Sequence, residues 1–287
     1  MNFVKAKQLF NHIKNSISKE FYTEEEITSV SFILLEDIYG ISKVDIITDR
    51  SLKTAITEQE IDIYLSRLHK GEPLQHITGK EYFDGLIFNV NKHVLIPRPE
   101  TEELVNLIKP VYSQNEALHI LDIGTGSGCI AVSLAHYFNK ASVYAMDFSK
   151  EALEIAAGNA KTNAVENIKF VHDSILSPTH TYPKFDLIVS NPPYIPESDK
   201  STMNISVLDY EPGEALFVKN DASLIFYERI VDFAYEYLNK GGSIFFECHH
   251  ILSVDVTKCF KSTDYESVEL IEDWYGKKRF VKTRKKV

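Results

Sequence analysis

The segment Asn191-Pro192-Pro193-Tyr194 contains the residue types needed to hold a planar NH₂ group in a fixed orientation. The side-chain amide oxygen of Asn191 and the backbone carbonyl oxygen of Pro192 can each accept one N–H. Consecutive prolines stiffen the segment and remove competing N–H donors, and the ring of Tyr194 can pack over a planar target. The alternative interpretation is a rigid proline turn, because Asn-Pro is itself a turn signal.

The nitrogen of a carboxamide or an aromatic amine is a weak nucleophile, because its lone pair is delocalised into the adjoining π system. Holding both of its hydrogens directs the lone pair at an electrophile, so the site requires alignment more than a strong base. Orientation alone contributes on the order of 7–11 kcal/mol in favourable cases. A methyl group carried on a sulfonium is an electrophile that suits this arrangement. Asn191, Pro192 and Tyr194 are therefore the candidate catalytic residues, and with Pro193 they are the candidate substrate contacts.

A glycine-rich loop lies between a predicted strand and a predicted helix in the second half of the chain. Glycines let the backbone turn tightly and let a ligand approach the peptide groups. The pattern is G-x-G-x-G behind Asp122 and lacks the later third glycine of dinucleotide-binding loops, so it suits a nucleoside joined to an amino acid better than a pyrophosphate. The candidate cofactor-binding residues of this loop are Gly124, Thr125, Gly126, Ser127 and Gly128.

Two aspartates lie near the ends of the next two predicted strands. Asp147 lies about 20 residues beyond the loop, at a place where a carboxylate can accept both hydroxyl groups of a ribose. Asp173 follows the third strand and could accept the amino group of an adenine; the alternative is an ordinary loop aspartate. Together with Asn191, these residues complete the predicted cofactor-binding set.

Strands and helices alternate from residue 118 onward, which is typical of a parallel α/β sheet. The predicted strands span residues 118–123, 142–146, 168–171, 185–190, 242–248 and 267–271. The predicted helices span residues 129–138, 150–162, 222–238 and 250–260. Ligands bind at the carboxyl ends of such strands, where the proline segment follows the fourth strand. Residues 192–219 lack strong periodicity and are expected to form a long functional loop.

The first 72 residues are predicted to be an all-helical domain. Capping-box patterns start helices at Thr23 with Glu26 and at Thr57 with Glu60, and Gly40 is predicted to end the first of them. No strand alternation is present there, and the apolar stripes are expected to form a core. Residues 73–97 are predicted to be a β-hairpin linker, because aromatic and β-branched runs flank an Asp-Gly turn signal.

The composition is that of a globular protein, with 44% hydrophobic and 25% charged residues. The formal charge of −10 argues against a nucleic-acid-binding surface, because such binding depends mainly on lysine and arginine. The basic stretch 277–286 is expected to be a solvated tail. The chain has neither a run near the ~18 apolar residues of a membrane span nor a leader-like start. Three scattered cysteines favour a reduced, cytoplasmic protein, and the histidines lack metal-ligand spacing.

The proline segment after a G-x-G-x-G loop resembles S-adenosylmethionine-dependent methyltransferases that act on planar NH₂ groups, the N6-adenine and N5-glutamine enzymes. Further stretches resemble the HemK/PrmC family, whose members methylate the glutamine of the Gly-Gly-Gln motif in peptide-chain release factors. These stretches are Pro73-Leu74-Gln75-His76-Ile77-Thr78-Gly79 with the run 83–90, Leu95-Ile96-Pro97-Arg98-Pro99-Glu100-Thr101-Glu102, and Glu211-Pro212 with Ala215-Leu216. The resemblance covers residues 72–281.

This resemblance implies a Rossmann-like class I methyltransferase domain over residues 98–287, with a mixed, mainly parallel seven-stranded sheet. It implies S-adenosyl-L-methionine as cofactor, S-adenosyl-L-homocysteine as product and no metal. It also implies a helical domain at residues 1–72 that recognises the substrate, and release factors as the protein partner. We expect a cytoplasmic monomer that binds neither DNA nor membranes.

The sequence departs from the family pattern at Ser174, where many relatives have an aromatic residue; Phe148 is a candidate to stack on the cofactor instead. Three alternatives remain at this point. A glutamine of a ribosomal protein and an adenine of nucleic acid fit the same chemistry, although the charge of the chain argues against the latter. A cofactor-binding interaction module without turnover is the third, and the intact proline segment argues against it.

Overall fold

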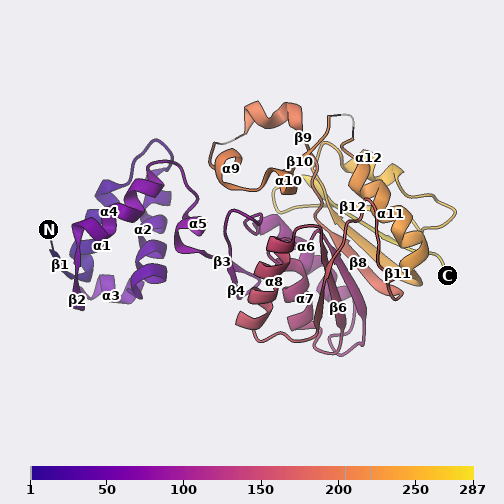
Figure 1. Cartoon of the computed structure of the whole chain (residues 1–287), viewed down its shortest axis with the longest axis horizontal. Coiled ribbons are helices and arrows are strands. Elements are labelled where there is room, and N and C mark those ends of the chain that lie inside the picture. The colour runs from indigo at the N-terminus through magenta and orange to yellow at the C-terminus, as the bar shows by residue number, and fades with distance from the viewer. Residues whose placement is uncertain (1, 204, 221) are drawn as a thin grey trace. The chain divides into compact units, whose positions relative to one another are not determined.

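The computed structural model describes residues 2–203, 205–220 and 222–287 and divides the chain into two compact units (Figure 1). One unit is Met1–Lys80 with Asn204–Tyr210, and the other is Glu81–Met203 with Glu211–Val287. Within the described residues, no helix combines the length and the apolar character that a membrane crossing requires.

The first unit is mainly helical, as predicted. Its helices are α1 (Ala6–Ser16), α2 (Glu24–Tyr39), α3 (Lys43–Ile47), α4 (Glu58–Leu68), α5 (Leu74–Thr78) and α9 (Ile205–Tyr210). Both predicted capping boxes are present: Thr23 with Glu26 starts α2, and Thr57 with Glu60 starts α4. Gly40 ends α2 in the left-handed conformation, with φ of 63°. The buried apolar side chains of these helices form one core.

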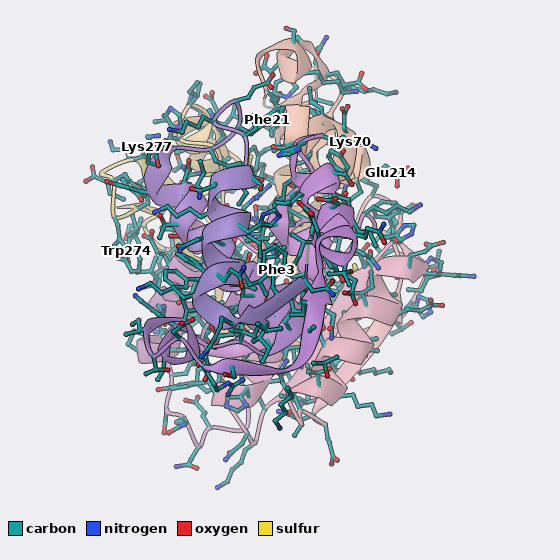
Figure 2. All side chains as sticks on the ribbon, turned by 90° about the vertical axis from the view of Figure 1, so that its left-hand side faces the viewer. Phe3, Phe21, Lys70, Glu214, Trp274 and Lys277 are labelled. Atoms are coloured by element: carbon teal, nitrogen blue, oxygen red, sulfur yellow. The ribbon has the colours of Figure 1, made fainter. Side chains whose placement is uncertain are left out.

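A two-stranded antiparallel ribbon corrects the expectation that this region contains only helices. β1 (Asn2–Lys5) pairs with β2 (Ser51–Thr57), and Phe3 lies opposite Ile56. Phe3 is buried against the helices of this unit (Figure 2), whereas most other residues of the two strands are exposed. Because each strand has a single buried position, the period-two alternation that identifies a strand in a sequence is missing.

The second unit contains the predicted seven-stranded, mixed and mainly parallel sheet. Its strands are β5 (His119–Ile123), β6 (Ser142–Asp147), β7 (Ile168–His172), β8 (Phe185–Ser190), β11 (Leu238–Glu247), β12 (Glu269–Glu272) and β13 (Lys278–Arg284). The strand order is β12-β13-β11-β8-β5-β6-β7, and β13 is antiparallel to both of its neighbours. The order reverses between β5 and β8, and ligands bind at such a switch point in open α/β sheets.

Helices cover both faces of this sheet (Figure 1). One face packs against α6 (Pro99–Ile108), α7 (Cys129–Tyr137) and α8 (Lys150–Thr162), and the other against α11 (Ile225–Tyr237) and α12 (Ser253–Lys258). Adjacent residues of a strand serve opposite faces: Ile120 belongs to the first core and Leu121 to the second. The central strands are therefore continuous apolar runs, which is why the sequence predicted them well.

The basic stretch 277–286 is not a solvated tail, which corrects that expectation. Residues 278–284 of this stretch form β13, where Phe280 and Val281 are buried in the sheet. Lys285 donates to the carbonyl oxygens of Ala234 (3.2 Å) and Leu238 (3.0 Å) at the end of α11, where a cation also complements the helix dipole. Cations at both ends and in the middle of this short strand interrupt its apolar pattern and so conceal it in the sequence. The turn before β13 leaves Trp274 exposed (Figure 2).

The predicted β-hairpin is formed by β3 (Lys80–Phe83) and β4 (Leu86–Asn89). Its turn residues Asp84 and Gly85 have φ of 53° and 75°, as a type I′ turn requires. The hairpin is attached to α8, because the side-chain oxygen of Asn159 accepts from the backbone N–H of Asn89 at 2.7 Å.

The remaining elements of the second unit are short. They are the 3₁₀ helix η1 (Lys109–Val111), β9 (Ile195–Pro196), the 3₁₀ helix η2 (Glu197–Thr202), α10 (Gly213–Leu216) and β10 (Phe217–Val218). The stretch 192–219 was expected to be one irregular loop, and it instead carries these short elements from β9 onward, together with α9. β9 and β10 pair in parallel and thereby join the two ends of the stretch.

Candidate active site

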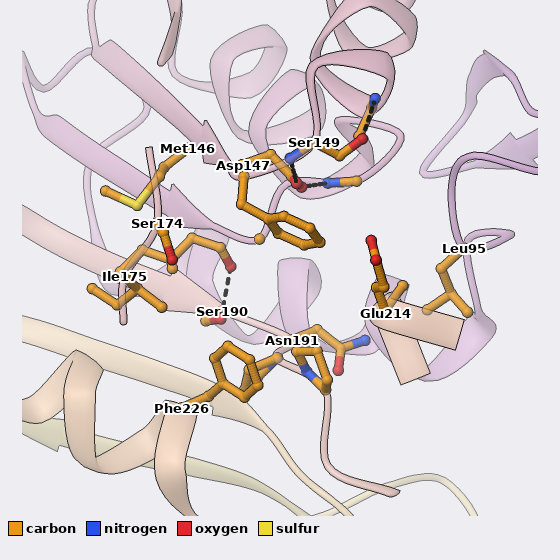
Figure 3. A pocket seen from close by; sticks show the side chains of 18 of the residues that line it. Leu95, Met146, Asp147, Ser149, Ser174, Ile175, Ser190, Asn191, Glu214 and Phe226 are labelled. Atoms are coloured by element: carbon orange, nitrogen blue, oxygen red, sulfur yellow. Dashed lines mark hydrogen bonds between the residues drawn. The ribbon is translucent and has the colours of Figure 1, made fainter. Parts of the chain in front are cut away.

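A cavity of about 340 Å³ opens at the carboxyl ends of β5, β6 and β8, at the switch point of the sheet (Figure 3). Asp147 and Asn191 lie on two sides of it (Figure 3). The predicted site residues that line it are Gly124, Gly126, Asp147, Asp173, Asn191, Pro192 and Pro193. Residues brought from different strands therefore share one cavity, as the parallel-sheet prediction required.

The glycine loop connects β5 to α7, and hydrogen bonds to the neighbouring strands fix its conformation. The backbone N–H groups of Gly124 and Thr125 donate to the carbonyl oxygen of Met146 at 2.9 and 3.0 Å. The hydroxyl of Thr125 donates to the buried Asp122 at 2.6 Å. A β-carbon added at Gly128, which has φ of 82°, would meet the β-carbon of Ala156 at 3.0 Å. Thr125, Ser127 and Gly128 thus shape the loop and do not line the cavity.

Asp147 is the last residue of β6, and its carboxylate is organised by two backbone groups. One oxygen accepts from the N–H of Gly126 and the other from the N–H of Ser149, both at 2.9 Å (Figure 3). Burial raises the pKa of Asp147, and these backbone hydrogen bonds oppose the rise. Each oxygen keeps a second lone pair, so the carboxylate can accept further hydrogen bonds on the cavity side.

Asp173 follows β7 and is engaged by its own loop. Its oxygens accept from the hydroxyl of Tyr182 (2.7 Å) and from the backbone N–H groups of Thr179 (3.0 and 3.1 Å), His180 (3.1 Å) and Ser174 (2.9 Å). Burial alone would raise the pKa of Asp173, but these hydrogen bonds lower it below the usual range. Asp173 therefore stabilises the conformation of its own loop. Its contact with an adenine stays a prediction.

We expect Asp173→Asn to lower the free energy of unfolding at pH 7 by about 2–3 kcal/mol, because an amide offers one acceptor oxygen where the loop supplies donors to two. The pKa of Asp173 is lowered in the folded protein. Its contribution is therefore fully present above the usual aspartate pKa of about 3.9 and is lost as the pH falls below that value. In urea unfolding, the difference in the free energy of unfolding between wild type and Asp173→Asn should become smaller towards about pH 3. A difference that does not change with pH would contradict the stabilising role of the ionised carboxylate.

Asn191 is the first residue after β8, and its amide has a defined orientation. Its Nδ2 donates to the hydroxyl of Thr101 at 3.2 Å, and its Oδ1 has no partner among the residues that the structure describes. Tyr194 does not line the cavity; its ring centroid lies 5.9 Å from that of His249. Burial and the nearby carboxyl of Glu247 raise the pKa of Tyr194 well above its usual value.

One ion pair joins two segments at the cavity. The buried carboxylate of Glu211 accepts from Nη2 of Arg98 at 2.5 Å and from the backbone N–H of Ile96 at 3.2 Å. The adjoining residues Leu95 and Pro212 both line the cavity. Glu211 belongs to the family-like stretch Glu211-Pro212, and in the structure it anchors the segment of Ile96 and Arg98.

Several lining residues were not predicted from the sequence: His93, Val94, Leu95, Met146, Glu214, Ala215, Phe226 and Ile230. Phe226 and Ile230 belong to the apolar face of α11. In the sequence this face cannot be distinguished from that of a helix that only packs on the sheet. Phe148, the candidate to stack on the cofactor, lines the cavity, as does Ser174, which stands where many relatives have an aromatic residue. Among the described residues there is no group of three or more His, Cys, Asp or Glu side chains that could hold a metal ion.

Two family models match parts of this chain. The family model of the methyltransferase small domain matches residues 102–208, and that of the PrmC N-terminal domain matches residues 9–79. A crystal structure of a methyltransferase from Pyrococcus furiosus aligns with a TM-score of 0.50 at 21% identity, covering 70% of this chain and 89% of that one. This similarity confirms the predicted Rossmann-like fold.

Two curated relatives named release factor glutamine methyltransferase extend over nearly the whole chain. The protein of Flavobacterium psychrophilum is 40% identical over 91% of this chain and 93% of its own length. That of Bacteroides thetaiotaomicron is 38% identical over 94% of this chain and 96% of its own. This chain therefore belongs to the family of release factor glutamine methyltransferases.

Proposed function

We propose that this protein transfers a methyl group from S-adenosyl-L-methionine to the side-chain amide nitrogen, N5, of the glutamine in the Gly-Gly-Gln motif of peptide-chain release factors. The observation that carries the proposal is the unpartnered Oδ1 of Asn191 at the edge of the cavity. Relatives that cover nearly the same length and bear the name release factor glutamine methyltransferase support the substrate.

The glutamine side chain presents an NH₂ group with two hydrogens. Oδ1 of Asn191 accepts one of them, and the carbonyl oxygen of Pro192 accepts the other, because no backbone N–H of the described residues is bonded to it. With both hydrogens held, the nitrogen lone pair points to one side and the amide cannot rotate, which supplies the alignment that a weak nucleophile needs. Tyr194 is proposed to pack against the planar amide.

The cavity fits an adenosyl cofactor in its chemistry. Gly124 and Gly126 bring backbone groups close to a ligand, and Asp147 offers acceptor atoms for ribose hydroxyls. Phe148 and Phe226 offer rings for a purine. Thr125, Ser127 and Gly128 belong to the proposed cofactor-binding loop and shape it from outside the cavity. We assign Asp173 to the purine end. When bound, the cofactor would supply an electrophilic methyl group on sulfur, leaving as S-adenosyl-L-homocysteine when the new C–N bond replaces the C–S bond. The glutamine nitrogen gives up one of its two N–H protons to solvent. Asn191, with its neighbours, faces both the cofactor and the glutamine.

We further propose that the helical region, residues 1–72, recognises the release factor and that residues 73–97 connect it to the catalytic domain, residues 98–287. We also propose that the protein acts in the cytoplasm as a monomer and that DNA is not one of its partners. The match of the PrmC N-terminal domain model to residues 9–79 supports a role specific to this family.

The test is methyl transfer to a purified release factor, followed by mass spectrometry of the peptide that contains Gly-Gly-Gln. With labelled S-adenosyl-L-methionine we expect one added methyl group, located on the glutamine by fragmentation. A release factor with Gln→Asn in the motif is the matched control and should remain unlabelled. Labelling of a ribosomal protein or of an adenine-containing DNA, with none of the release factor, would overturn the proposal.

A further inference from the structure

A chain of two hydrogen bonds runs from the proposed catalytic amide into the protein interior. Nδ2 of Asn191 donates to Oγ1 of Thr101 at 3.2 Å, and Oγ1 of Thr101 donates to Oε2 of Glu247 at 2.7 Å. Thr101 is 4% exposed and Glu247 is 2% exposed. The three residues come from the end of β8, the first turn of α6 and the end of β11.

The direction of these bonds is set by the chemistry of the groups. An ionised carboxylate can only accept, so the hydroxyl of Thr101 must give its single proton to Glu247. The hydroxyl oxygen then has only lone pairs to offer Asn191, and only the NH₂ end of the amide can bond to it. Oδ1 is therefore turned away from Thr101, and it is the atom that the proposed function requires as an acceptor.

We propose that Thr101 and Glu247 are positioning residues that hold the Asn191 amide in the one orientation that presents an oxygen to the substrate NH₂ group. Neither residue touches the substrate; they act through Asn191. The inference rests on the proposed function, because the opposite orientation of the amide would set its NH₂ group against that of the glutamine. Two donors facing each other cannot form a hydrogen bond.

The protonation state of Glu247 controls this direction. Burial raises the pKa of Glu247 to about 7, while the hydrogen bond from Thr101 and the charges of Arg279 and Arg98 oppose the rise and Glu100 adds to it. Among the described residues, four further titratable groups interact electrostatically with Glu247, and burial raises the pKa of each: Tyr194, Tyr227, Cys129 and Cys248. These four groups therefore stay neutral where Glu247 titrates.

Protonation of Glu247 removes the constraint. A carboxylic acid can donate to the hydroxyl of Thr101, and this hydroxyl can then donate to Oδ1 of Asn191, which turns the amide round. The productive form is the ionised one, so turnover is complete above the pKa of Glu247, about 7, and falls as the pH drops below it.

The first experiment compares Thr101→Val, which keeps the shape and removes the hydroxyl, with Thr101→Ser, which keeps the hydroxyl. We expect kcat for release-factor methylation to fall by about 10–100-fold in Thr101→Val, with the KM for cofactor changed by less than about threefold. Thr101→Ser should restore most of the rate. The matched control is Ser133→Ala, because this buried hydroxyl has no hydrogen-bond partner among the described residues and lies in α7.

The second experiment measures kcat against pH. Wild type should lose turnover below about pH 7, and Glu247→Gln should abolish that dependence because it has no titrating group there. His249 must be separated from Glu247, since its ring adjoins Tyr194 and burial lowers its pKa. His249→Gln should keep the dependence of wild type.

A readout without turnover is the side-chain ¹⁵NH₂ signal of Asn191 in NMR spectra of the full chain. We expect it to shift with the pH in step with the ¹³C signal of the Glu247 carboxyl, and to lose this shift in Thr101→Val. If wild type methylates the release factor but Thr101→Val retains its rate, pH profile and Asn191 signal, the positioning role is wrong. If wild type itself methylates no release factor, the proposed function fails instead. Should Thr101→Val not fold, Glu247→Gln and the wild-type NMR titration decide.

Discussion

Asn191→Ala is expected to lower kcat for glutamine methylation by about 10²–10³-fold, the loss seen when one preorganised hydrogen-bond partner of a reacting group is removed. Alanine leaves the carbonyl oxygen of Pro192 as the single acceptor, so the substrate NH₂ group can rotate and its lone pair loses alignment. The backbone of the segment stays stiff because Pro192 and Pro193 remain. Single-turnover methylation of a release factor at saturating cofactor measures this loss directly.

The cofactor should still bind to this variant. Its dissociation constant, measured by calorimetry, should change by less than about threefold, because the strongest polar contacts proposed for it lie at Asp147 and the glycine loop. Asn106→Ala is the matched control, since this asparagine is exposed on α6, the helix that carries Thr101. Wild-type turnover in Asn191→Ala would remove Asn191 from the reaction and with it the proposed mechanism.

The parts of the site that the sequence predicted depend on short-range patterns. The glycine loop and Asn191 are each recognisable within a few residues and directly follow apolar runs that are buried on both faces. Strand–helix alternation then implies that such segments meet at one edge of the sheet. The position of one of the seven strands, β13, was not predicted, because lysines and arginines interrupt its apolar pattern. In the structure, Arg284 and the adjoining Lys285 donate hydrogen bonds to main-chain carbonyl oxygens.

The bond between Thr101 and Glu247 could not be predicted in the same way. These residues are 146 positions apart in the chain, and their meeting depends on strand order and on how α6 packs against β11. Thr101 lies at the start of a helix and Glu247 at the end of a strand. In each case the secondary structure alone accounts for the local sequence, so nothing marks the residue as part of the site. Phe226 was missed for a related reason, because one face of its helix serves both the core and the cavity.

Asp147→Asn is expected to raise the dissociation constant for S-adenosyl-L-methionine by about 10²-fold. Hydrogen bonds to a charged acceptor contribute about 1.5–3 kcal/mol each, and the change removes the charge and one of the two acceptor oxygens. The new NH₂ group would also face a backbone N–H, that of Gly126 or Ser149, since each now donates to one carboxylate oxygen. Calorimetric titration of the protein with cofactor measures the effect.

Asn191→Ala is expected to change kcat, and Asp147→Asn the KM for cofactor. Comparing the two variants therefore tests whether Asn191 orients the substrate while Asp147 binds the cofactor. In Asp147→Asn the KM for cofactor should rise while kcat at saturation stays within about threefold of wild type, because uniform binding is lost and the alignment at Asn191 is intact. Glu154→Gln removes the same charge from an exposed position on α8 and should change neither constant. An unchanged dissociation constant in Asp147→Asn would place the ribose elsewhere, and a fall in kcat with unchanged affinity would mean that Asp147 acts on the reacting groups.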